Sequence, residues 1–362
     1  MRPVKDKKPR TETASAGATN PTGESLPPLF SRQGIAREFR EHFPIWLVYI
    51  TAVGMLHATL ANVPAQAFAG AGFPRQMFFV TTLFPLSWFT LYFILRIRRS
   101  KRAAPRWKAY LALAGLVLGV PLAVFFFYLP YPFTRDQMKA LYEFSAFFWA
   151  ALLAVHIILA RGRHALALFF GVALSFGLLL ENTGIIMGFF SEPGFRVYLW
   201  FLPAPLCTVL SWSMVFAVAI SVTDRLSEWA AWLAPWKGAW RRAGAAAAMA
   251  LCLDAQIDPL ASLSGLFWRW NDLLSPVFFG VPLVNFAAWF GAVSVFSFFT
   301  FRVRDRRDWS PGRKNYELFL RVPLACFLAL AVCFSVVAVA EGGFDGPSFR
   351  ILRAFGERLL AP

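Results

Sequence analysis

The feature that most constrains this chain is a series of apolar segments, each about 20 residues or longer, separated by short polar connections. A helix of about 20 apolar residues crosses the ~30 Å hydrocarbon core of a bilayer. Hydrophobic residues make up 58% of the chain and charged residues only 15%, whereas an average soluble domain is about 45–50% apolar. The sequence therefore predicts an integral membrane protein, and it excludes a soluble two-domain enzyme or a secreted disulfide scaffold.

We expect an all-α fold, a polytopic transmembrane helical bundle of about nine spans. The expected spans are residues 44–64, 76–97, 106–131, 142–160, 164–190, 198–224, 243–262, 281–303 and 318–340. Lys and Arg concentrate in the N-terminal tail and in alternate connections, which places the N-terminus in the cytoplasm by the positive-inside rule. The formal charge of +16 is then explained by basic residues that contact lipid headgroups and set the membrane topology. We therefore expect no nucleic-acid partner.

Three regions follow from this reading. Residues 1–30 are rich in Thr, Ser, Pro, Gly and basic residues and contain no apolar signal segment, which predicts a disordered basic tail. Residues 31–343 form the transmembrane helical domain. In residues 344–362 we expect a short amphipathic tail, with a helix over 347–360 lying on the membrane surface.

Of the twenty acidic residues, only Glu181, Asp254 and Asp258 fall well inside expected spans. A carboxyl group in hydrocarbon is costly, so such a residue marks a functional site unless it caps a helix or pairs with an arginine. Asp254 and Asp258 are four residues apart and share one helix face. Two neighbouring carboxyls in a low-dielectric site cannot both ionise cheaply, which yields a general acid beside a general base. Asn285, near the start of the next span, and Glu181 are expected at a similar depth, so these four residues are the catalytic candidates.

Aromatic residues surround these positions in the sequence, namely Trp212, Trp268, Trp270, Phe286 and Trp289. Packing is the simpler explanation for any one of them in so aromatic a chain. Trp289 nevertheless lies four residues after Asn285, on the same helix face, and aromatic rings stabilise a carbocation. No nucleotide-binding or metal-ligand motif occurs in a credible context, and the four cysteines form no close pair. We therefore expect neither a cofactor nor a metal.

Five segments of the sequence carry a resemblance to a known family. They are residues 253–259 (LDAQIDP), 265–270 (GLFWRW) and 280–289 (GVPLVNFAAW), with 181–184 (ENTG) and 203–212 (PAPLCTVLSW) upstream. Over about residues 145–300 the chain resembles the bacterial and archaeal carotenoid biosynthesis family of membrane hydratases, of the bisanhydrobacterioruberin and γ-carotene hydratase type. Residues 191–200 (SEPGFRVYLW) depart from the Tyr-rich run usual in that family and keep one tyrosine, Tyr198, as a candidate substrate contact.

The resemblance implies an enzyme of the prokaryotic cytoplasmic membrane that adds water to the terminal double bond of an acyclic (ψ) carotenoid end group. Its partners are then the polyene, water and membrane lipid, with other carotenoid enzymes as further candidates. Protonation of the less substituted carbon gives a tertiary cation that water captures, which requires an acid, a base and aromatic walls but no cofactor. Asp254 or Asp258 would donate the proton, the other carboxylate or Glu181 would activate water, and Asn285 would orient it.

Three other functions compete with hydration. Paired aspartates also hold Mg²⁺ against a diphosphate in intramembrane prenyltransferases, although only Arg269 lies between the seventh and eighth spans to bind such a group. Buried acids also mark proton-coupled transporters, for which we find no matching repeated half. A non-catalytic pigment-binding or assembly protein is the third alternative.

Overall fold

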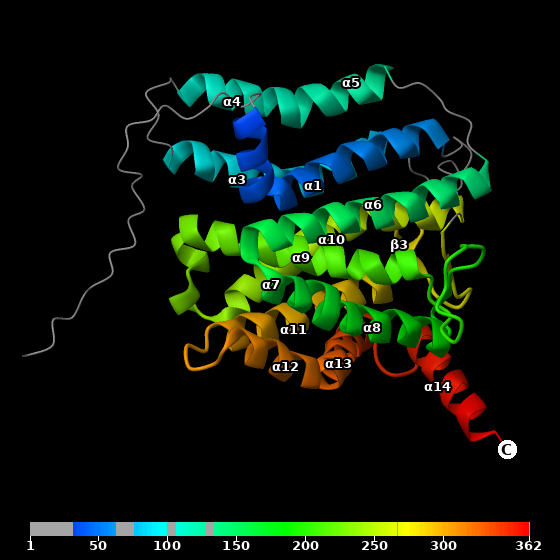
Figure 1. Ribbon diagram of the computed structural model, residues 1–362. Coiled ribbons are helices and arrows are strands. Elements are labelled where there is room, and N and C mark those ends of the chain that lie inside the picture. The colour runs from blue at the N-terminus through cyan, green and yellow to red at the C-terminus, as the bar shows by residue number, and fades with distance from the viewer. Residues whose placement is uncertain (1–31, 63–75, 100–105, 128–133, 266, 362) are drawn as a thin grey trace, which may run out of the picture.

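A computed structural model describes residues 32–62, 76–99, 106–127, 134–265 and 267–361 of the chain. The expected N-terminal tail, 1–30, lies outside the described residues. The described part is a bundle of helices that run side by side along one common direction (Figure 1).

The helices share one pattern, long apolar segments joined by short connections. They are α1 (Arg32–Asn62), α3 (Gln76–Arg99), α4 (Arg106–Ala114), α5 (Val120–Phe127), α6 (Arg135–Arg161), α7 (Arg163–Ala167), α8 (Ala173–Met187), α9 (Leu206–Trp229), α10 (Ala239–Ser264), α11 (Leu283–Arg304), α12 (Pro311–Leu320), α13 (Val322–Ala340) and α14 (Pro347–Leu360). Short π-helical turns, Gly115–Gly119 and Leu168–Val172, join α4 to α5 and α7 to α8, so each pair forms one continuous rod. Two 3₁₀ turns, Ala231–Leu233 and Pro235–Lys237, connect α9 to α10.

Helices α9 and α10 form the centre of the bundle. Helix α9 contacts α6, α8 and α10, while α10 packs against α3 and α11, and α11 packs against α13. In Figure 1 the pair α1 and α3 with α4–α5 lies on one side of this centre, and α11 to α13 lie on the other. Helices α11 and α13 approach each other closely at Gly291, where an added Cβ would come within 2.5 Å of the Ala329 carbonyl oxygen. A glycine is required there because any side chain would separate α11 from α13.

Two loops meet at one end of the bundle, one between α8 and α9 and the other between α10 and α11. Strand β1 (Phe190–Ser191) pairs antiparallel with β2 (Arg269–Trp270), which ties the first loop to the second. Within the second loop, β3 (Pro276–Phe278) pairs with β4 (Val281–Pro282). The turn between them holds Phe279 at φ 46° and Gly280 at φ 82°, the two left-handed residues that tight hairpins favour. These short strands had no signal in the sequence.

Eight described helical segments are long and apolar enough to cross a membrane. They correspond to the second to ninth expected spans, and the expected first span, 44–64, coincides with α1 as far as Asn62. The expected span 198–224 begins too early, because α9 starts only at Leu206. Pro203 and Pro205 keep residues 198–205 in the loop, since proline lacks an amide hydrogen and disfavours helix in the residue before it. The amphipathic helix expected at 347–360 is present as α14.

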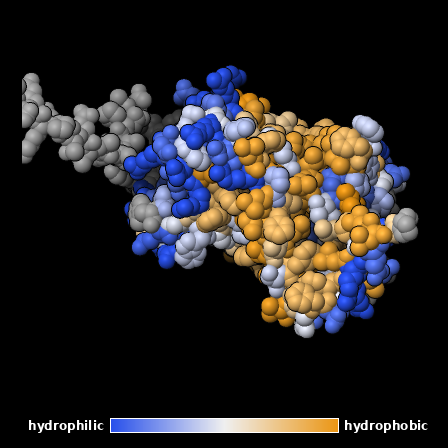
Figure 2. Space-filling view, turned by 90° about the horizontal axis from the view of Figure 1, so that it is seen from below, coloured by the Kyte–Doolittle hydropathy of each residue, from blue (hydrophilic) through white to orange (hydrophobic). Residues whose placement is uncertain are grey.

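The outer surface is that of a protein in lipid. Many large apolar side chains on the helices point outward with most of their surface exposed, including Leu111, Phe126, Phe144 and Phe327. Figure 2 shows such side chains gathered across the middle of one face, with polar residues toward both ends. Exposure of this kind is unfavourable in water but favourable against hydrocarbon chains.

Candidate functional site

Asp254, Asp258 and Asn285 form one buried polar cluster between α10 and α11. The Asn285 Nδ2 donates to Asp254 Oδ1 at 2.9 Å and to Asp258 Oδ2 at 2.5 Å. Asp254 is completely buried, and Asp258 and Asn285 are 3% and 8% exposed. The one-turn spacing of the two aspartates thus brings both carboxyl groups to a single amide, as the sequence predicts.

A second carboxyl pair consists of Glu181, in the second half of α8, and Glu192, in the loop that follows. Their side chains lie within hydrogen-bonding reach of each other. Glu181 Oε2 accepts a 2.5 Å hydrogen bond from Trp212 Nε1, and Glu192 Oε2 accepts one of 3.1 Å from the Thr208 hydroxyl. Burial and the negative charge of Glu181 raise the pKa of Glu192 well above its usual range.

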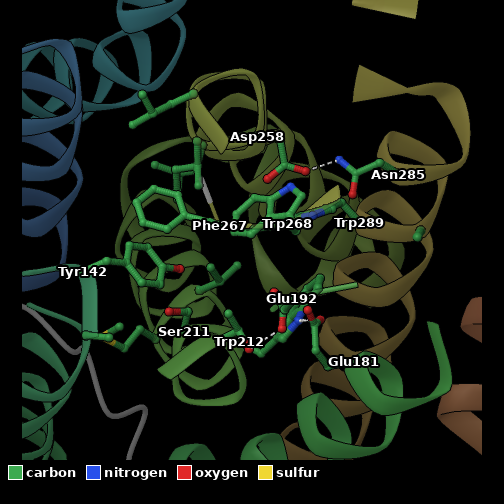
Figure 3. Close-up of a pocket in the computed structure, with 18 of the residues that line it drawn as sticks. Tyr142, Glu181, Glu192, Ser211, Trp212, Asp258, Phe267, Trp268, Asn285 and Trp289 are labelled. Atoms are coloured by element: carbon green, nitrogen blue, oxygen red, sulfur yellow. Dashed lines mark hydrogen bonds between the residues drawn. The ribbon is translucent and has the colours of Figure 1, made fainter. Parts of the chain in front are cut away.

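Both clusters open onto one cavity of about 530 Å³ (Figure 3). Apart from the carboxyl groups and a few hydroxyls, its walls are aliphatic and aromatic, and they come from α1, α6, α8, α9, α10, α11 and α13. Trp212 and Trp289 lie against each other with ring centroids 4.6 Å apart, and Tyr142 and Phe267 form a second ring pair at the same distance. A large apolar pocket with a few converging polar groups is the usual form of a small-molecule site.

Contacts with α6 and α8 hold the loop that carries Glu192. Glu143 Oε1 accepts the backbone N–H groups of Arg196 and Val197 at 2.8 and 3.1 Å, and Lys139 donates to the Pro193 carbonyl at 2.6 Å. Asn182 Oδ1 accepts the N–H of Ala204 at 3.0 Å, so the residue after Glu181 anchors the end of the same loop. These contacts explain how Glu192, which lies outside the helices, is only 5% exposed.

The structure brings most of the expected site residues to the cavity. The expected residues that line the cavity are Asp258, Glu181, Asn285, Trp212, Trp268, Trp270 and Trp289. Asp254 lies behind Asp258, without access to the cavity. Tyr198 and Phe286 are also absent from the cavity lining: the Tyr198 hydroxyl donates to the Glu192 carbonyl at 2.7 Å, and Phe286 packs on Phe278. Tyr198 thus supports the loop, and neither residue enters the proposed substrate site.

Sequence reasoning missed several polar residues of the cavity wall, among them Glu192, Tyr142 and Ser211. The hydroxyl groups of Tyr142 and Ser211 lie within hydrogen-bonding reach of each other. Glu192 was missed because it lies just beyond an expected span, in a segment that looks like a solvent-exposed loop. Within the described ranges no group of three or more His, Cys, Asp or Glu side chains has the arrangement of a metal site.

Comparison with known families gives a match that covers most of the residues of the site. The family described as carotenoid biosynthesis protein matches residues 142–347, more than half of the chain. The chain belongs to the carotenoid biosynthesis protein family. The matched residues include both carboxyl pairs and all four cavity tryptophans named above, whereas the wall supplied by α1 lies outside them. No curated protein and no solved structure matches the chain.

Proposed function

We propose that the protein hydrates the terminal double bond of an acyclic carotenoid end group inside this cavity, in a prokaryotic cytoplasmic membrane. The observation that carries the proposal is the Asp254–Asn285–Asp258 cluster, a buried pair of carboxyls set in the wall of a large apolar cavity. Membership of the carotenoid biosynthesis family supports a carotenoid-related substrate.

The carboxyl pair suits protonation of an alkene. Two adjacent carboxyls in a water-poor site share one proton, because two negative charges at that separation repel strongly. Of the two, Asp258 faces the cavity and Asp254 lies behind it. Asp258 is therefore the proton donor in our proposal. Asp254 retains the negative charge, which the Asn285 amide stabilises by donating to both carboxyl groups.

The aromatic wall suits the cation that follows. Proton transfer to the less substituted carbon leaves a positive charge on the tertiary carbon, and the faces of Trp212 and Trp289 present negative potential to such a charge. Water then forms the carbon–oxygen bond and loses a proton. The net change is addition of one water across the double bond.

The substrate enters from the bilayer in this proposal. Ile50 on α1 and Leu141 on α6 line the cavity, yet they are 39% and 47% exposed on the outer surface. The cavity therefore approaches the lipid-facing surface between these two helices. A carotenoid is insoluble in water, so an end group inserted sideways from the membrane reaches the acid without leaving an apolar environment.

Asp258→Asn is the direct test. We expect it to reduce hydration at least 100-fold, the usual contribution of a general acid, while the protein still accumulates in the membrane, because the amide keeps the size of the carboxyl. The measurement is liquid chromatography with mass spectrometry of pigments from cells that make an acyclic carotenoid. Wild-type protein should yield a species heavier by one water. An unchanged yield from the variant would contradict the role of Asp258, and no hydrated species with the wild type would contradict the function.

A further inference from the structure

The cavity contains a second carboxyl pair that the reaction above does not yet use. Glu192 is 5% exposed and lines the cavity together with Glu181. In Figure 3 the two glutamates lie on one side of Trp268 and Trp289, and Asp258 with Asn285 lies on the other. Members of both pairs, Asp258 and Glu181 among them, nevertheless line the same cavity.

Neither carboxyl pair is neutralised by a basic residue. None of the ion pairs within the described ranges includes Glu181, Glu192, Asp254 or Asp258. Their polar partners are neutral donors: an amide, an indole N–H and a hydroxyl. A carboxyl with neutral donors can gain or lose a proton at modest cost, whereas one paired with arginine stays ionised.

The wall between the two pairs has an unused hydrogen-bond donor. Among the described buried polar atoms without a partner, only the Trp268 Nε1 belongs to a residue that lines the cavity. Trp268 is 8% exposed. An indole N–H left without an acceptor in the interior is unfavourable, so this donor indicates that an oxygen atom binds between the two carboxyl pairs.

We propose that Glu192 and Glu181 act together as the base that accepts the proton of the attacking water, opposite the aspartate pair that protonates the carbon. The inference rests on the hydration proposed above and deepens it by separating acid from base. Glu192 takes part because its carboxyl shares a proton with Glu181, so that one negative charge remains in the pair. The Trp268 N–H holds the oxygen of the water and later that of the product hydroxyl.

The proton balance closes over one cycle. The aspartate pair gives one proton to the carbon, and the glutamate pair receives one proton when the water oxygen bonds to the cation. The glutamate pair then carries two protons and the aspartate pair none. One proton returns from the glutamates to the aspartates through the water that enters for the next turnover, and no further reactant is required.

The assignment of acid and base to different carboxyl pairs predicts that two reactions can be measured separately in heavy water, namely deuterium exchange into the substrate and hydration. Transfer of a deuteron from the aspartate pair, followed by loss of the original proton from the same carbon back to that pair, leaves deuterium in the recovered carotenoid, whereas capture by water gives the hydrated product. Removal of the base slows only the second outcome. We expect Glu192→Gln to lower the hydrated product at least tenfold, while deuterium uptake into recovered substrate stays within about twofold of the wild type.

The experiment uses membranes that contain the full-length protein, an acyclic carotenoid and D₂O, with both products measured by mass spectrometry. Glu181→Gln, which removes the other half of the pair, should show the same split, and Asp258→Asn should lose both products. Glu143→Gln is the matched control, because its side chain supports the same loop without lining the cavity. The amide oxygen still accepts both N–H groups, so its ratio of product to exchange should equal that of the wild type.

The outcomes also separate this inference from the function on which it rests. If Glu192→Gln lowers hydration and exchange equally, or lowers neither, the assignment of the base is overturned and the hydratase function stands. If the wild-type protein produces neither hydration nor exchange, the function itself is overturned, and the base with it.

Discussion

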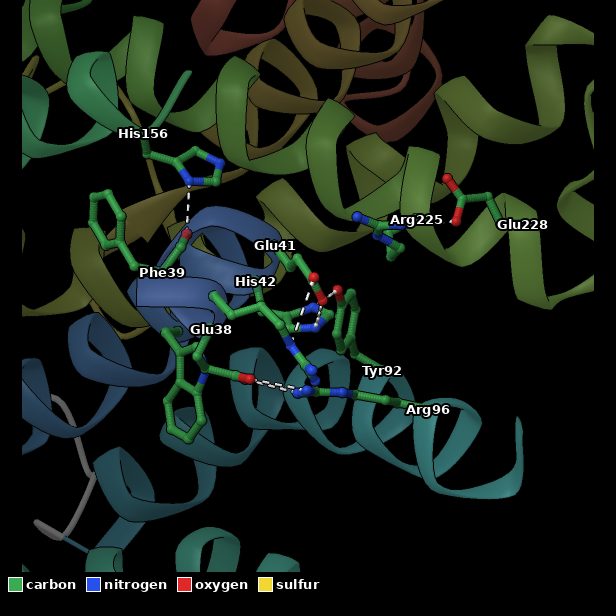
Figure 4. Close-up of polar contacts among 11 residues, drawn as sticks. Glu38, Phe39, Glu41, His42, Tyr92, Arg96, His156, Arg225 and Glu228 are labelled. Carbon is green, nitrogen blue, oxygen red and sulfur yellow. Dashed lines mark hydrogen bonds and ion pairs between the residues drawn. The ribbon is translucent and has the colours of Figure 1, made fainter. Parts of the chain in front are cut away.

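Two glutamates at opposite ends of the bundle, the partly buried Glu38 and the buried Glu192, differ in their partners. Glu38, in the first turns of α1, accepts two hydrogen bonds from Arg96, at 2.7 and 2.9 Å, and one from Trp46 at 2.9 Å (Figure 4). Glu192 has only the Thr208 hydroxyl and a second carboxyl. Burial alone would raise the pKa of both, but at Glu38 the bonds from Arg96 and Trp46 bring the pKa below its usual value.

We interpret the difference as one between polar residues that stabilise the fold and those of the proposed site. The cluster around Glu38 is saturated: the His42 ring bonds the Tyr92 hydroxyl at 2.6 Å, and the His156 Nδ1–H donates to the Phe39 carbonyl at 2.8 Å. Such a network fixes α1 against α3 and α6. The carboxyls at the cavity have no cation partner, and one nearby donor is unused. Burial without charge compensation, next to an empty volume, is the arrangement expected for proton transfer.

The largest loss of stability should come from breaking the charge pair at Glu38. Arg96→Met leaves a mostly buried carboxylate without its cation, and we expect a loss of roughly 1–3 kcal/mol in stability. The amount of folded protein in the membrane should fall severalfold, while the hydrated product per folded molecule stays unchanged. The measurement combines folded yield by size-exclusion chromatography with pigment analysis. Loss of product per folded molecule would contradict the structural role of this cluster.

A smaller effect is expected from Gly177, which controls the position of Trp212. A Cβ at residue 177 would lie 2.6 Å from the Trp212 Cβ, so α9 or the indole must shift in Gly177→Ala. Because Trp212 donates to Glu181 and forms part of the aromatic wall, we expect about a tenfold loss of hydration with little loss of folded protein. Gly171→Ala is the matched control, since nothing lies within 4 Å of the corresponding position. Equal activity of the two variants would show that the place of Trp212 is not critical.

Features that depend on local sequence pattern could be predicted from the sequence, whereas features that depend on contacts between distant segments could not. The spans follow from apolar length, and the convergence of Asp254, Asp258 and Asn285 follows from helix periodicity and topology. The burial of Glu192 does not, because it depends on the pairing of Phe190 with Trp270 and on the capping of loop amides by Glu143. Such contacts join residues more than 50 positions apart and leave no periodic signal. The late start of α9 was readable from Pro203 and Pro205, whose effect outweighs the apolar character of that segment.

The smallest effect is a difference in how stability changes with pH. The pKa of Glu38 is lowered in the fold, so its contribution is present above the ordinary carboxyl range of about 4–5 and is lost as pH falls. The pKa of Glu192 is raised, so the fold favours its protonated form, and that contribution is lost as pH rises.

Glu38→Gln should therefore be most destabilising near pH 7 and less so near pH 4. Glu192→Gln should become more stable relative to the wild type as pH rises. Each difference should amount to a few degrees in the unfolding midpoint, measured in detergent between pH 4 and 8. If the unfolding midpoints of the two variants changed with pH in the same way, the two glutamates would lie in equivalent environments, and the difference between a carboxyl paired with arginine and one without a cation would be contradicted.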